Sequence, residues 1–342
     1  MVHYLAEVTF FAPRLEVLAD QVRMNTNNSN EAQEIHAELI HDEDVLKVRN
    51  QSIDDELHNL SIIHPYGYTL PERYVQYHQR IQEFDILDDD VFIATHQKCG
   101  TTWMTELVWR VRNDPEFKET KASLKERVPF LDDTIIDHKD RLSVSSFELT
   151  EQLNRPRTIK THLPFDLLPR QLQQNKAKIV CVIRNPRDTC QSLLNHYRVL
   201  EKYTGGFETI ANVFLKDLGF NWGPFFKNVL SYWERRHQDN ILLVSYEEMQ
   251  QDLGLVIKKV AKFVDVSMDE NQVISLVEKL SFKSMKQNAV NSYKGGPHDL
   301  SKLYNKGKTG SWKDIFTPSM IEKFEKWEEK WLTDTDLTFT YE

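Results

Sequence analysis

One stretch decides the fold of this chain: Val91-Phe-Ile-Ala-Thr-His-Gln-Lys-Cys-Gly-Thr-Thr-Trp-Met-Thr-Glu-Leu-Val-Trp109. It opens with an apolar run, Val91–Ala94, which is typical of a buried parallel strand. A polar loop with Lys98 and Gly100 follows, and from Thr101 the apolar residues recur at helical spacing. Strand, glycine loop and helix start together predict an anion site, because a helix N-terminus presents free N–H groups and the lysine adds a full charge.

The loop departs from two common phosphate-binding patterns. The nucleoside-triphosphate loop requires G-x-x-x-x-G-K-[ST], whereas Lys98 here precedes Gly100. A tyrosine-phosphatase loop would need an arginine six positions after Cys99, where this chain has Thr105. Taken alone, the stretch leaves open an ordinary strand–turn–helix with an exposed lysine.

Composition excludes several classes of protein. The 342 residues are 40% hydrophobic and 28% charged, which is typical of a globular chain of one large or two ordinary domains. A net charge of −9 argues against general affinity for nucleic acid or an acidic membrane surface. No apolar run approaches the roughly 18 residues of a membrane span, and the N-terminal residues do not resemble a signal peptide. Three cysteines without a C-x-x-C indicate a reducing compartment, so we expect a cytoplasmic protein.

A second candidate site lies at the end of a short strand predicted within Arg157–Pro164. His162 ends this strand, and in open α/β sheets ligands bind at the carboxyl ends of parallel strands. Lys160, two residues earlier, points to the same side. The alternative interpretation is a histidine whose hydrogen bonds are satisfied in the core.

A third candidate site follows an apolar strand, Ile179–Ile183. Arg184 ends this strand, and the planar guanidinium suits phosphate binding, although a pair with a nearby carboxylate would also explain an arginine here. Asp188 is placed to cap the following helix, with Ser192 one turn into it.

The rest of the chain gives weaker signals. Residues 1–55 are polar and read as an extension that packs on the body or serves regulation. Asp88–Asp90 is typical of a solvated turn. Residues 116–150 are charged and aperiodic apart from the apolar run at 128–131, which predicts a surface insertion that shapes an acceptor pocket. Residues 193–240 are helical in pattern and rich in aromatic residues, most of them expected in the core.

These elements together resemble the cytosolic sulfotransferases. Residues 98–103 are similar to that family's Lys-Ser/Cys-Gly-Thr-Thr-Trp loop, 160–164 to its Lys-Thr-His-Leu-Pro, and 184–192 to its Arg-Asn-Pro-x-Asp-x-x-x-Ser. Residues 304–317, basic and glycine-punctuated, resemble its Arg-Lys-Gly-x-x-Gly-Asp-Trp-Lys loop. The resemblance covers about residues 60–330. It implies an α/β fold with a single P-loop-like domain over 56–342, in which helices flank a central parallel sheet.

The resemblance also implies a donor and residue roles. The donor would be 3′-phosphoadenosine-5′-phosphosulfate (PAPS), with PAP as the product and no metal. His162 would take the acceptor proton, and Lys98 and Lys160 would stabilise the developing negative charge. Ser192 joins these three in the implied catalytic set and, with Arg184, binds the 3′-phosphate. The implied cofactor-binding residues are Lys98, Cys99, Gly100, Thr101, Thr102, Trp103, Arg184, Ser192, Tyr246, Ser281, Phe282, Asn305, Lys306 and Gly307.

Several positions depart from the family pattern. His96-Gln97 replaces Tyr-Pro before the loop lysine, and Asn305 replaces an arginine that would grip phosphate. Leu280 replaces a threonine, and Ser311 replaces an aspartate. The family's dimer motif contains Pro318 here. Proline cannot donate a backbone hydrogen bond, which weakens the case for pairing through this motif, so a homodimer stays an open alternative.

The predicted function is transfer of a sulfuryl group from PAPS to a hydroxyl or amine of a small apolar acceptor, such as a phenol, steroid or retinoid alcohol. Two alternatives stay open. One is a non-catalytic PAP- or PAPS-binding protein. The other is a net dehydratase that acts through a transient sulfate ester, as the resemblance to insect retinol dehydratases implies. A P-loop kinase is disfavoured, since the loop at Lys98–Gly100 lacks the G-K-[ST] order and the sequence shows no carboxylate pattern for Mg²⁺.

Overall fold

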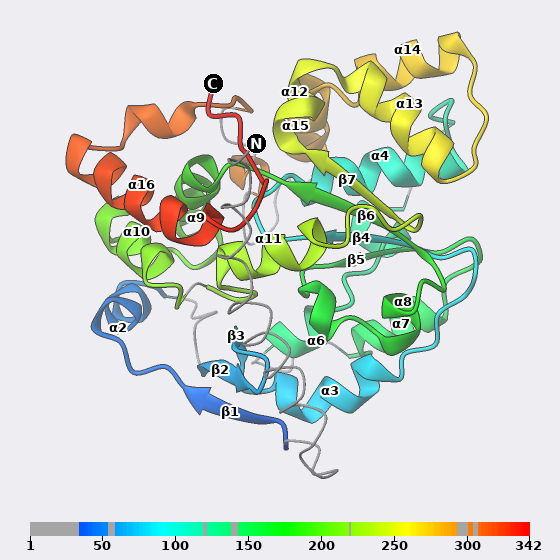
Figure 1. Ribbon diagram of the computed structural model, residues 1–342. Coiled ribbons are helices and arrows are strands. Elements are labelled where there is room, and N and C mark those ends of the chain that lie inside the picture. Colours follow the sequence, from blue (N-terminus) through cyan, green and yellow to red (C-terminus); the bar gives the residue numbers. More distant parts are fainter. Residues whose placement is uncertain are drawn as a thin grey trace, which may run out of the picture.

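A four-stranded parallel sheet lies at the centre of the molecule (Figure 1). Its strand order is β5 (Thr158–Thr161), β4 (Val91–Thr95), β6 (Lys178–Ile183) and β7 (Ile241–Ser245). The computed structural model describes residues 34–53, 59–118, 122–137, 143–218, 220–292, 300–303 and 307–342. All three neighbouring strand pairs are parallel, as the apolar runs predict.

The two faces of this sheet are buried in two separate clusters, because successive side chains of a strand point to opposite faces. Val91 and Ile93 pack with α4 (Thr101–Asn113), α13 (Leu253–Phe263) and α14 (Glu270–Lys279). Phe92 and Ala94 pack instead with α9 (Pro186–Leu200) and α11 (Phe225–Trp233). The predicted α/β fold with a central parallel sheet flanked by helices is therefore confirmed.

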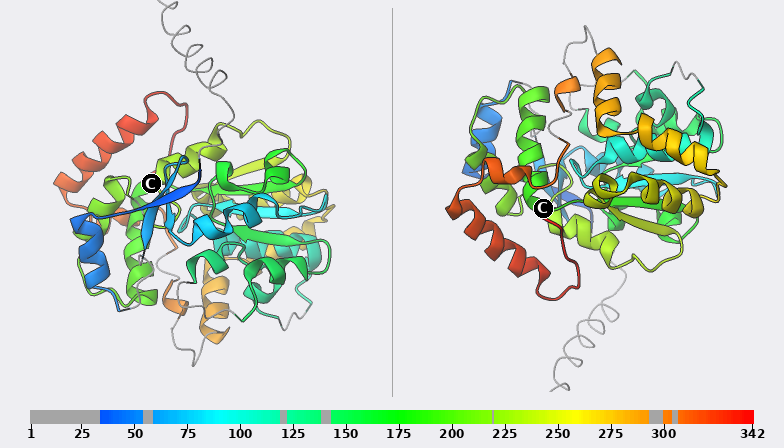
Figure 2. Two further views of the ribbon diagram at one scale, coloured as in Figure 1. Left: turned by 90° about the horizontal axis from the view of Figure 1, so that it is seen from below. Right: turned by 90° about the horizontal axis from the view of Figure 1, so that it is seen from above.

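A small antiparallel sheet extends the domain. Its strands are β1 (His36–Leu39), β2 (Leu60–His64) and β3 (Tyr68–Pro71). Next to it, α2 (Glu43–Asn50) lies beside α10 (Phe207–Leu215), and both views of Figure 2 place α16 (Pro318–Leu332) on the same side of the molecule. Part of the polar segment 1–55 therefore belongs to the fold, with Val45 and Val48 buried.

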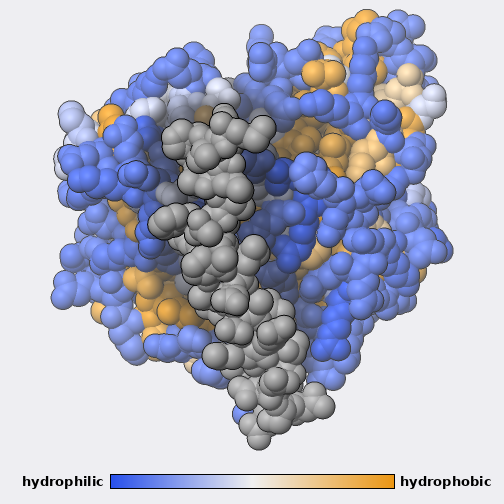
Figure 3. Space-filling view, viewed as in Figure 1, coloured by the Kyte–Doolittle hydropathy of each residue, from blue (hydrophilic) through white to orange (hydrophobic). Residues whose placement is uncertain are grey.

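The remaining elements are short helices and 3₁₀ turns. They are α3 (Tyr74–Gln82), α5 (Leu124–Arg127), α6 (Asp133–Ile136), α7 (Ser146–Glu151), η1 (Phe165–Leu167), α8 (Arg170–Gln173), α12 (Tyr246–Gln251), α15 (Phe282–Ser292), η2 (Leu300–Leu303) and η3 (Ser311–Asp314). Pro318 is the first residue of α16, and the hydroxyl of Thr317 caps the N-terminus of this helix. Exposed apolar side chains gather over α13 and α14, among them Leu255 and Ile274 (Figure 3).

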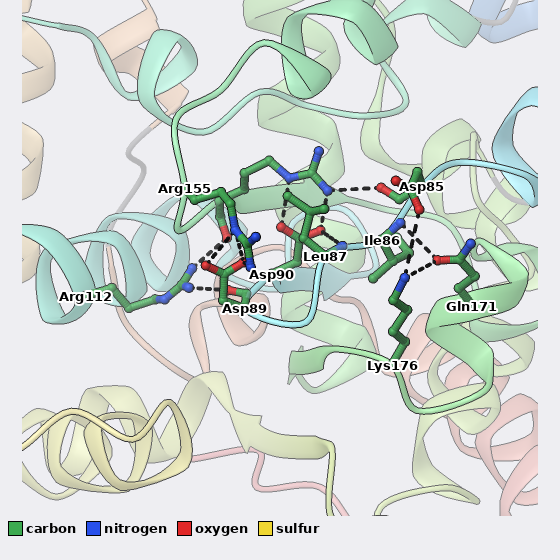
Figure 4. Close-up of polar contacts among 10 residues, drawn as sticks. Asp85, Ile86, Leu87, Asp89, Asp90, Arg112, Arg155, Gln171 and Lys176 are labelled. Carbon is green, nitrogen blue, oxygen red and sulfur yellow. Dashed lines mark hydrogen bonds and ion pairs between the residues drawn. The ribbon is translucent and has the colours of Figure 1, made fainter.

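The solvated turn predicted at Asp88–Asp90 is wrong for Asp90, which is 1% exposed. Its carboxylate accepts from the Arg157 guanidinium, with Nε 2.8 Å from Oδ1, and from the backbone N–H of Leu87 at 2.8 Å. Arg112 donates to the Asp89 carbonyl, and Arg155 donates to the Asp89 carboxylate (Figure 4). This network lies at the amino end of the sheet. The Asp90 carboxylate can be buried there because the Arg157 guanidinium compensates its charge.

The surface insertion predicted over residues 116–150 is also wrong in part. Leu131 and Ile135 are buried, and the Leu131 N–H donates to the Lys160 carbonyl at 2.8 Å. The segment thus runs beside β5 and continues the edge of the sheet. The short apolar run at 128–131 coincides with part of this burial, whereas no periodic pattern in the charged residues that follow indicates that Ile135 is buried.

The helix cap after β6 also differs from the prediction. Asn185, not Asp188, caps α9: its Oδ1 accepts from the Asp188 N–H at 2.8 Å. Pro186 occupies the first helical position, which proline favours. Ser192 consequently lies nearly two turns into α9 rather than one.

Candidate active site

A cavity of about 440 Å³ opens at the carboxyl ends of the central strands. Its walls come from the loop after β4, the ends of β5 and β6, and helices α9 and α15. The lining residues include Lys98, Gly100, Thr101, Thr102, Trp103, Lys160, His162, Arg184, Ser192, Tyr246, Phe282, Gly307 and Lys308. Residues predicted from four separate stretches of sequence are therefore brought together in one space.

The loop between β4 and α4 places a helix N-terminus at this cavity. Gly100 has φ of 104° and precedes the first helical residue, Thr101. A Cβ on Gly100 would lie 2.7 Å from Cδ2 of Tyr246, so a larger residue would meet both left-handed strain and a ring. Thr101 Oγ1 lies 2.5 Å from Thr95 Oγ1, which ties the start of the helix to the end of the strand.

His162 is held in one orientation by backbone contacts. Its Nδ1 lies 2.6 Å from the Thr95 carbonyl oxygen. Because a carbonyl only accepts, Nδ1 carries the proton and the neutral ring keeps its lone pair on Nε2. Burial and the neighbouring Lys160 cation hold the pKa of His162 well below its usual value. The ring is therefore neutral near neutral pH, the state that a proton acceptor needs.

A buried carboxylate that sequence reasoning missed supports this histidine. Asp132, which is 0% exposed, accepts from the His162 backbone N–H at 2.8 Å and from Thr161 Oγ1 at 2.6 Å. Burial raises the pKa of Asp132 to about 6, although these two hydrogen bonds lower it. No local pattern singles out Asp132, since it lies 30 residues before His162 in a charged stretch.

The two lysines approach the cavity from different elements. Lys160 Nζ lies 3.9 Å from the centroid of the Phe130 ring, a cation–π contact. Lys98 Nζ lies 3.5 Å from Nδ1 of His196, which also lines the cavity. His196 was missed as well, although it follows Ser192 by four residues and so shares its helix face.

Arg184 lies at the end of β6, where the phosphate-binding role was predicted. Its Nη1 donates to the Lys98 carbonyl at 3.1 Å, and its guanidinium lies 4.2 Å from the centroid of the Tyr246 ring. Its Nε is buried and has no hydrogen-bond partner among the described residues. A buried donor without a partner is costly, so this nitrogen favours an incoming anion.

Aromatic rings form one wall of the cavity. Trp103 donates from Nε1 to the Leu280 carbonyl at 2.8 Å and meets the edge of Tyr246 at 5.8 Å. Leu280 takes part through its backbone, so the loss of a threonine hydroxyl leaves this contact intact. Phe282 packs against Gly307, where a Cβ would lie 2.4 Å from the ring.

The loop that precedes α16 is fastened by one carboxylate. Asp188 accepts from the Gly310 N–H at 2.8 Å, the Ser311 hydroxyl at 3.0 Å and the Trp312 N–H at 3.0 Å. Ser311, a departure from the family pattern, is therefore used in this chain as a hydrogen-bond donor. Gly307 and Lys308 of the same segment line the cavity.

Some predicted residues do not reach the cavity with their side chains. Cys99 is 0% exposed, with Sγ 3.8 Å from Thr189 Oγ1, and burial raises the pKa of its thiol to about 12. Ser281 bonds to the Ser284 hydroxyl at 2.9 Å and is not among the lining residues. Asn305 and Lys306 lie outside the described residues.

The replaced pair before the lysine loop is accommodated in the interior. His96 is 4% exposed, and its ring meets the edge of Phe225 at 5.0 Å. Burial lowers the pKa of His96 to about 4, so the ring is neutral. Gln97 Nε2 donates to the Asn221 carbonyl at 3.1 Å. His96 and Gln97 therefore attach the loop between β4 and α4 to the residues at 221–225.

Taken together, the cavity offers cations, a helix N-terminus, an aromatic wall and a neutral histidine. This combination can bind a phosphorylated nucleotide and accept a proton from a hydroxyl next to it. Within the described residues, no group of three or more His, Cys, Asp or Glu side chains is placed to hold a metal ion. No helix in this part of the chain is long and apolar enough to cross a membrane.

Comparison with known proteins gives consistent matches. The family model described as "Sulfotransferase domain" matches residues 88–336. The luciferin sulfotransferase of Photinus pyralis is 35% identical over 280 residues, which cover 75% of this chain and 75% of that protein. Sulfotransferase 1B1 of Mus musculus is 33% identical over 290 residues, covering 82% and 94%. A solved structure of retinol dehydratase in complex with retinol and PAP is similar, with a TM-score of 0.80 and 27% identity over 90% of this chain and 99% of that chain.

Proposed function

The chain belongs to the sulfotransferase family, and from this premise we propose that it transfers a sulfuryl group from PAPS to a hydroxyl of a small apolar acceptor. The observation that carries the proposal is the neutral His162 ring, which lines the same cavity as Lys98, Lys160 and the N-terminus of α4. The named sulfotransferases among the relatives favour this function over a binding protein without catalysis and over a net dehydratase.

The described residues fit PAPS. The buried Arg184 Nε without a partner and the narrow space at Gly100 suit an anion that lies close to the backbone. We assign the 5′-phosphosulfate to Lys98 and the first residues of α4, and the 3′-phosphate to Arg184 and Ser192. The adenine ring would lie against Trp103, Tyr246 and Phe282. Bound there, PAPS supplies a sulfuryl group activated by its phosphate.

The chemistry assigned to the chain divides among three groups. His162 Nε2 takes the proton of the acceptor hydroxyl, while the Thr95 carbonyl and Asp132 hold the residue in place. Lys98 stabilises the negative charge that builds on the leaving phosphate, and Lys160 assists it.

Apolar side chains also line the cavity, namely Phe130, Ile136, Leu200, Trp222, Met285 and Leu303. We place the acceptor beside Phe130 and Trp222, the two that contact His162. Phe130 and Trp222 meet the edges of the His162 ring, at 5.0 and 4.7 Å between centroids. A flat hydroxylated molecule that packs against these rings from the cavity would place its oxygen near His162, so we propose phenols, steroids and retinoid alcohols as acceptors.

We also propose a cytoplasmic location. Cys99, Cys181 and Cys190 are all free and buried, as expected for a chain kept in a reducing compartment. Self-association through residues 313–322 is a separate proposal, which sedimentation at several concentrations tests.

The test is calorimetric titration of the purified protein with PAP and, as the control, with ATP. We expect micromolar or tighter PAP binding and none for ATP. Arg184→Met should weaken PAP binding by about tenfold or more, since a charge-assisted hydrogen bond is lost. Comparable binding of ATP and PAP would contradict the donor assignment. Binding of PAP without turnover of PAPS and a phenol would leave a binding protein.

A further inference from the structure

A second histidine faces the reacting end of the cavity. His196 lies on α9 four residues after Ser192, and both line the cavity. Its Nδ1 lies 3.5 Å from Lys98 Nζ. The ring also meets the edge of Tyr197, with 5.7 Å between centroids. The assigned sulfuryl transfer uses Lys98 and His162 but gives His196 no role.

The geometry determines the state of this pair. An ammonium group only donates, so its hydrogen bond needs an unprotonated Nδ1 on His196. The neutral ring then carries its proton on Nε2. Lys98 lies in the loop between β4 and α4, two residues before Gly100, and has a long, flexible side chain, so an acceptor on α9 restricts where its Nζ can lie.

We propose that His196 is a positioning residue, which holds the ammonium of Lys98 at the place where charge develops during sulfuryl transfer. The inference rests on the proposed function, because it gives the lysine its role. It predicts an effect on turnover rather than on nucleotide affinity: the contacts assigned to the 3′-phosphate and adenine do not involve His196. Positioning of this kind matters, since small misplacements of a catalytic group cost large factors in rate.

Three substitutions separate positioning from packing. His196→Phe keeps a ring against Tyr197 but removes the acceptor. His196→Asn removes the ring but places an oxygen on the same branch as Nδ1. His196→Gln places its oxygen one bond further out. Arg198→Gln, at an exposed position of the same helix, is the matched control.

Steady-state kinetics with PAPS and a simple phenol give the first readout. We expect His196→Phe and His196→Gln to lower kcat by about tenfold with KM for PAPS within twofold, the loss of one hydrogen bond to a charged group. His196→Asn should restore most of kcat. In a Lys98→Met background, His196→Phe should have no further effect. Equal kcat for the Phe variant and the parent, a Phe variant better than Asn, or additive losses in the Lys98→Met background would each overturn the proposal.

A second readout needs no turnover. Acetic anhydride labels free amines, and mass spectrometry gives the rate at Lys98. We expect faster labelling of Lys98 in His196→Phe than in the parent and in His196→Asn. Equal rates in all three would overturn the proposal. If the parent protein does not turn over PAPS, the proposed function fails, while the labelling rates still decide whether His196 holds Lys98.

Discussion

At the amino ends of β4 and β5, Arg157 lies buried against Asp90, whereas at the carboxyl ends of the same sheet Lys98, Lys160 and Arg184 line a cavity. At the amino end, Figure 4 shows arginines that meet carboxylates or carbonyl groups of the chain itself.

At the carboxyl end, the carboxylates among the described lining residues are Asp133 and Asp188. Asp133 pairs with Lys125 at 2.7 Å, and Asp188 is occupied by the loop at 310–312. Paired charge therefore lies buried at one end of the sheet, whereas at the other end Lys98, Lys160 and Arg184 line the cavity in which we propose that an anionic ligand binds.

Removing the proposed base at the cavity end should lower turnover more than any other substitution considered. His162→Ala should lower kcat by about 10²–10⁴-fold, because the acceptor proton loses its base. Steady-state turnover of PAPS and a phenol measures this loss. Calorimetric binding of PAP, expected to be retained, is the control for folding. Near-normal turnover would remove His162 from its assigned role.

The pH dependence of kcat/KM for PAPS also tests the role of His162. Because burial holds the pKa of His162 well below the ordinary value of about 6.5, its neutral form persists as the pH falls through that value. The kcat/KM for PAPS, which reports the free enzyme, should therefore stay level between about pH 8 and pH 6. A half-maximal rate near the ordinary imidazole pKa would show that the ring is not held neutral.

The next effect breaks the comparison at the other end. Asp90→Ala leaves Arg157 buried without its partner, which should cost about 3–5 kcal/mol of unfolding free energy. Urea denaturation measures this loss. Removing both partners in Asp90→Ala/Arg157→Leu should recover part of it. At temperatures where Asp90→Ala stays folded, its kcat should match the parent. A stability equal to the parent's would mean that the pair contributes nothing to the closed end.

The smallest effect on stability is expected for the exposed ion pair between Arg155 and Asp89. Arg155 and Asp89 pair at 2.9 Å, but both side chains are largely open to water. Arg155→Gln should leave both the urea midpoint and kcat unchanged, because water and salt screen exposed pairs. A loss of unfolding free energy comparable to that of Asp90→Ala would show that this exposed pair stabilises the fold as much as the buried one.

The sequence could predict what depends on neighbours along the chain. The strand end at Arg184 follows from the apolar run at 179–183, the one at His162 from a short strand that Pro164 ends, and Gly100 with Thr101 from one loop. Asp90 was misjudged because its partner, Arg157, lies 67 residues later. Asp132 and His196 were missed for the same reason: each acquires its role from a residue distant in sequence, His162 and Lys98.

The contact between Gly100 and Tyr246 has a consequence for how this protein can evolve. Residue 100 is constrained twice, because its φ is positive and because the ring occupies the place where a side chain on it would begin. A lineage that first lost Tyr246 for a small residue would gain space at the loop, yet the φ of 104° would still penalise any replacement of the glycine. Drift at residue 246 therefore does not open residue 100 to change, and the two positions should diverge at different rates among descendants of this chain.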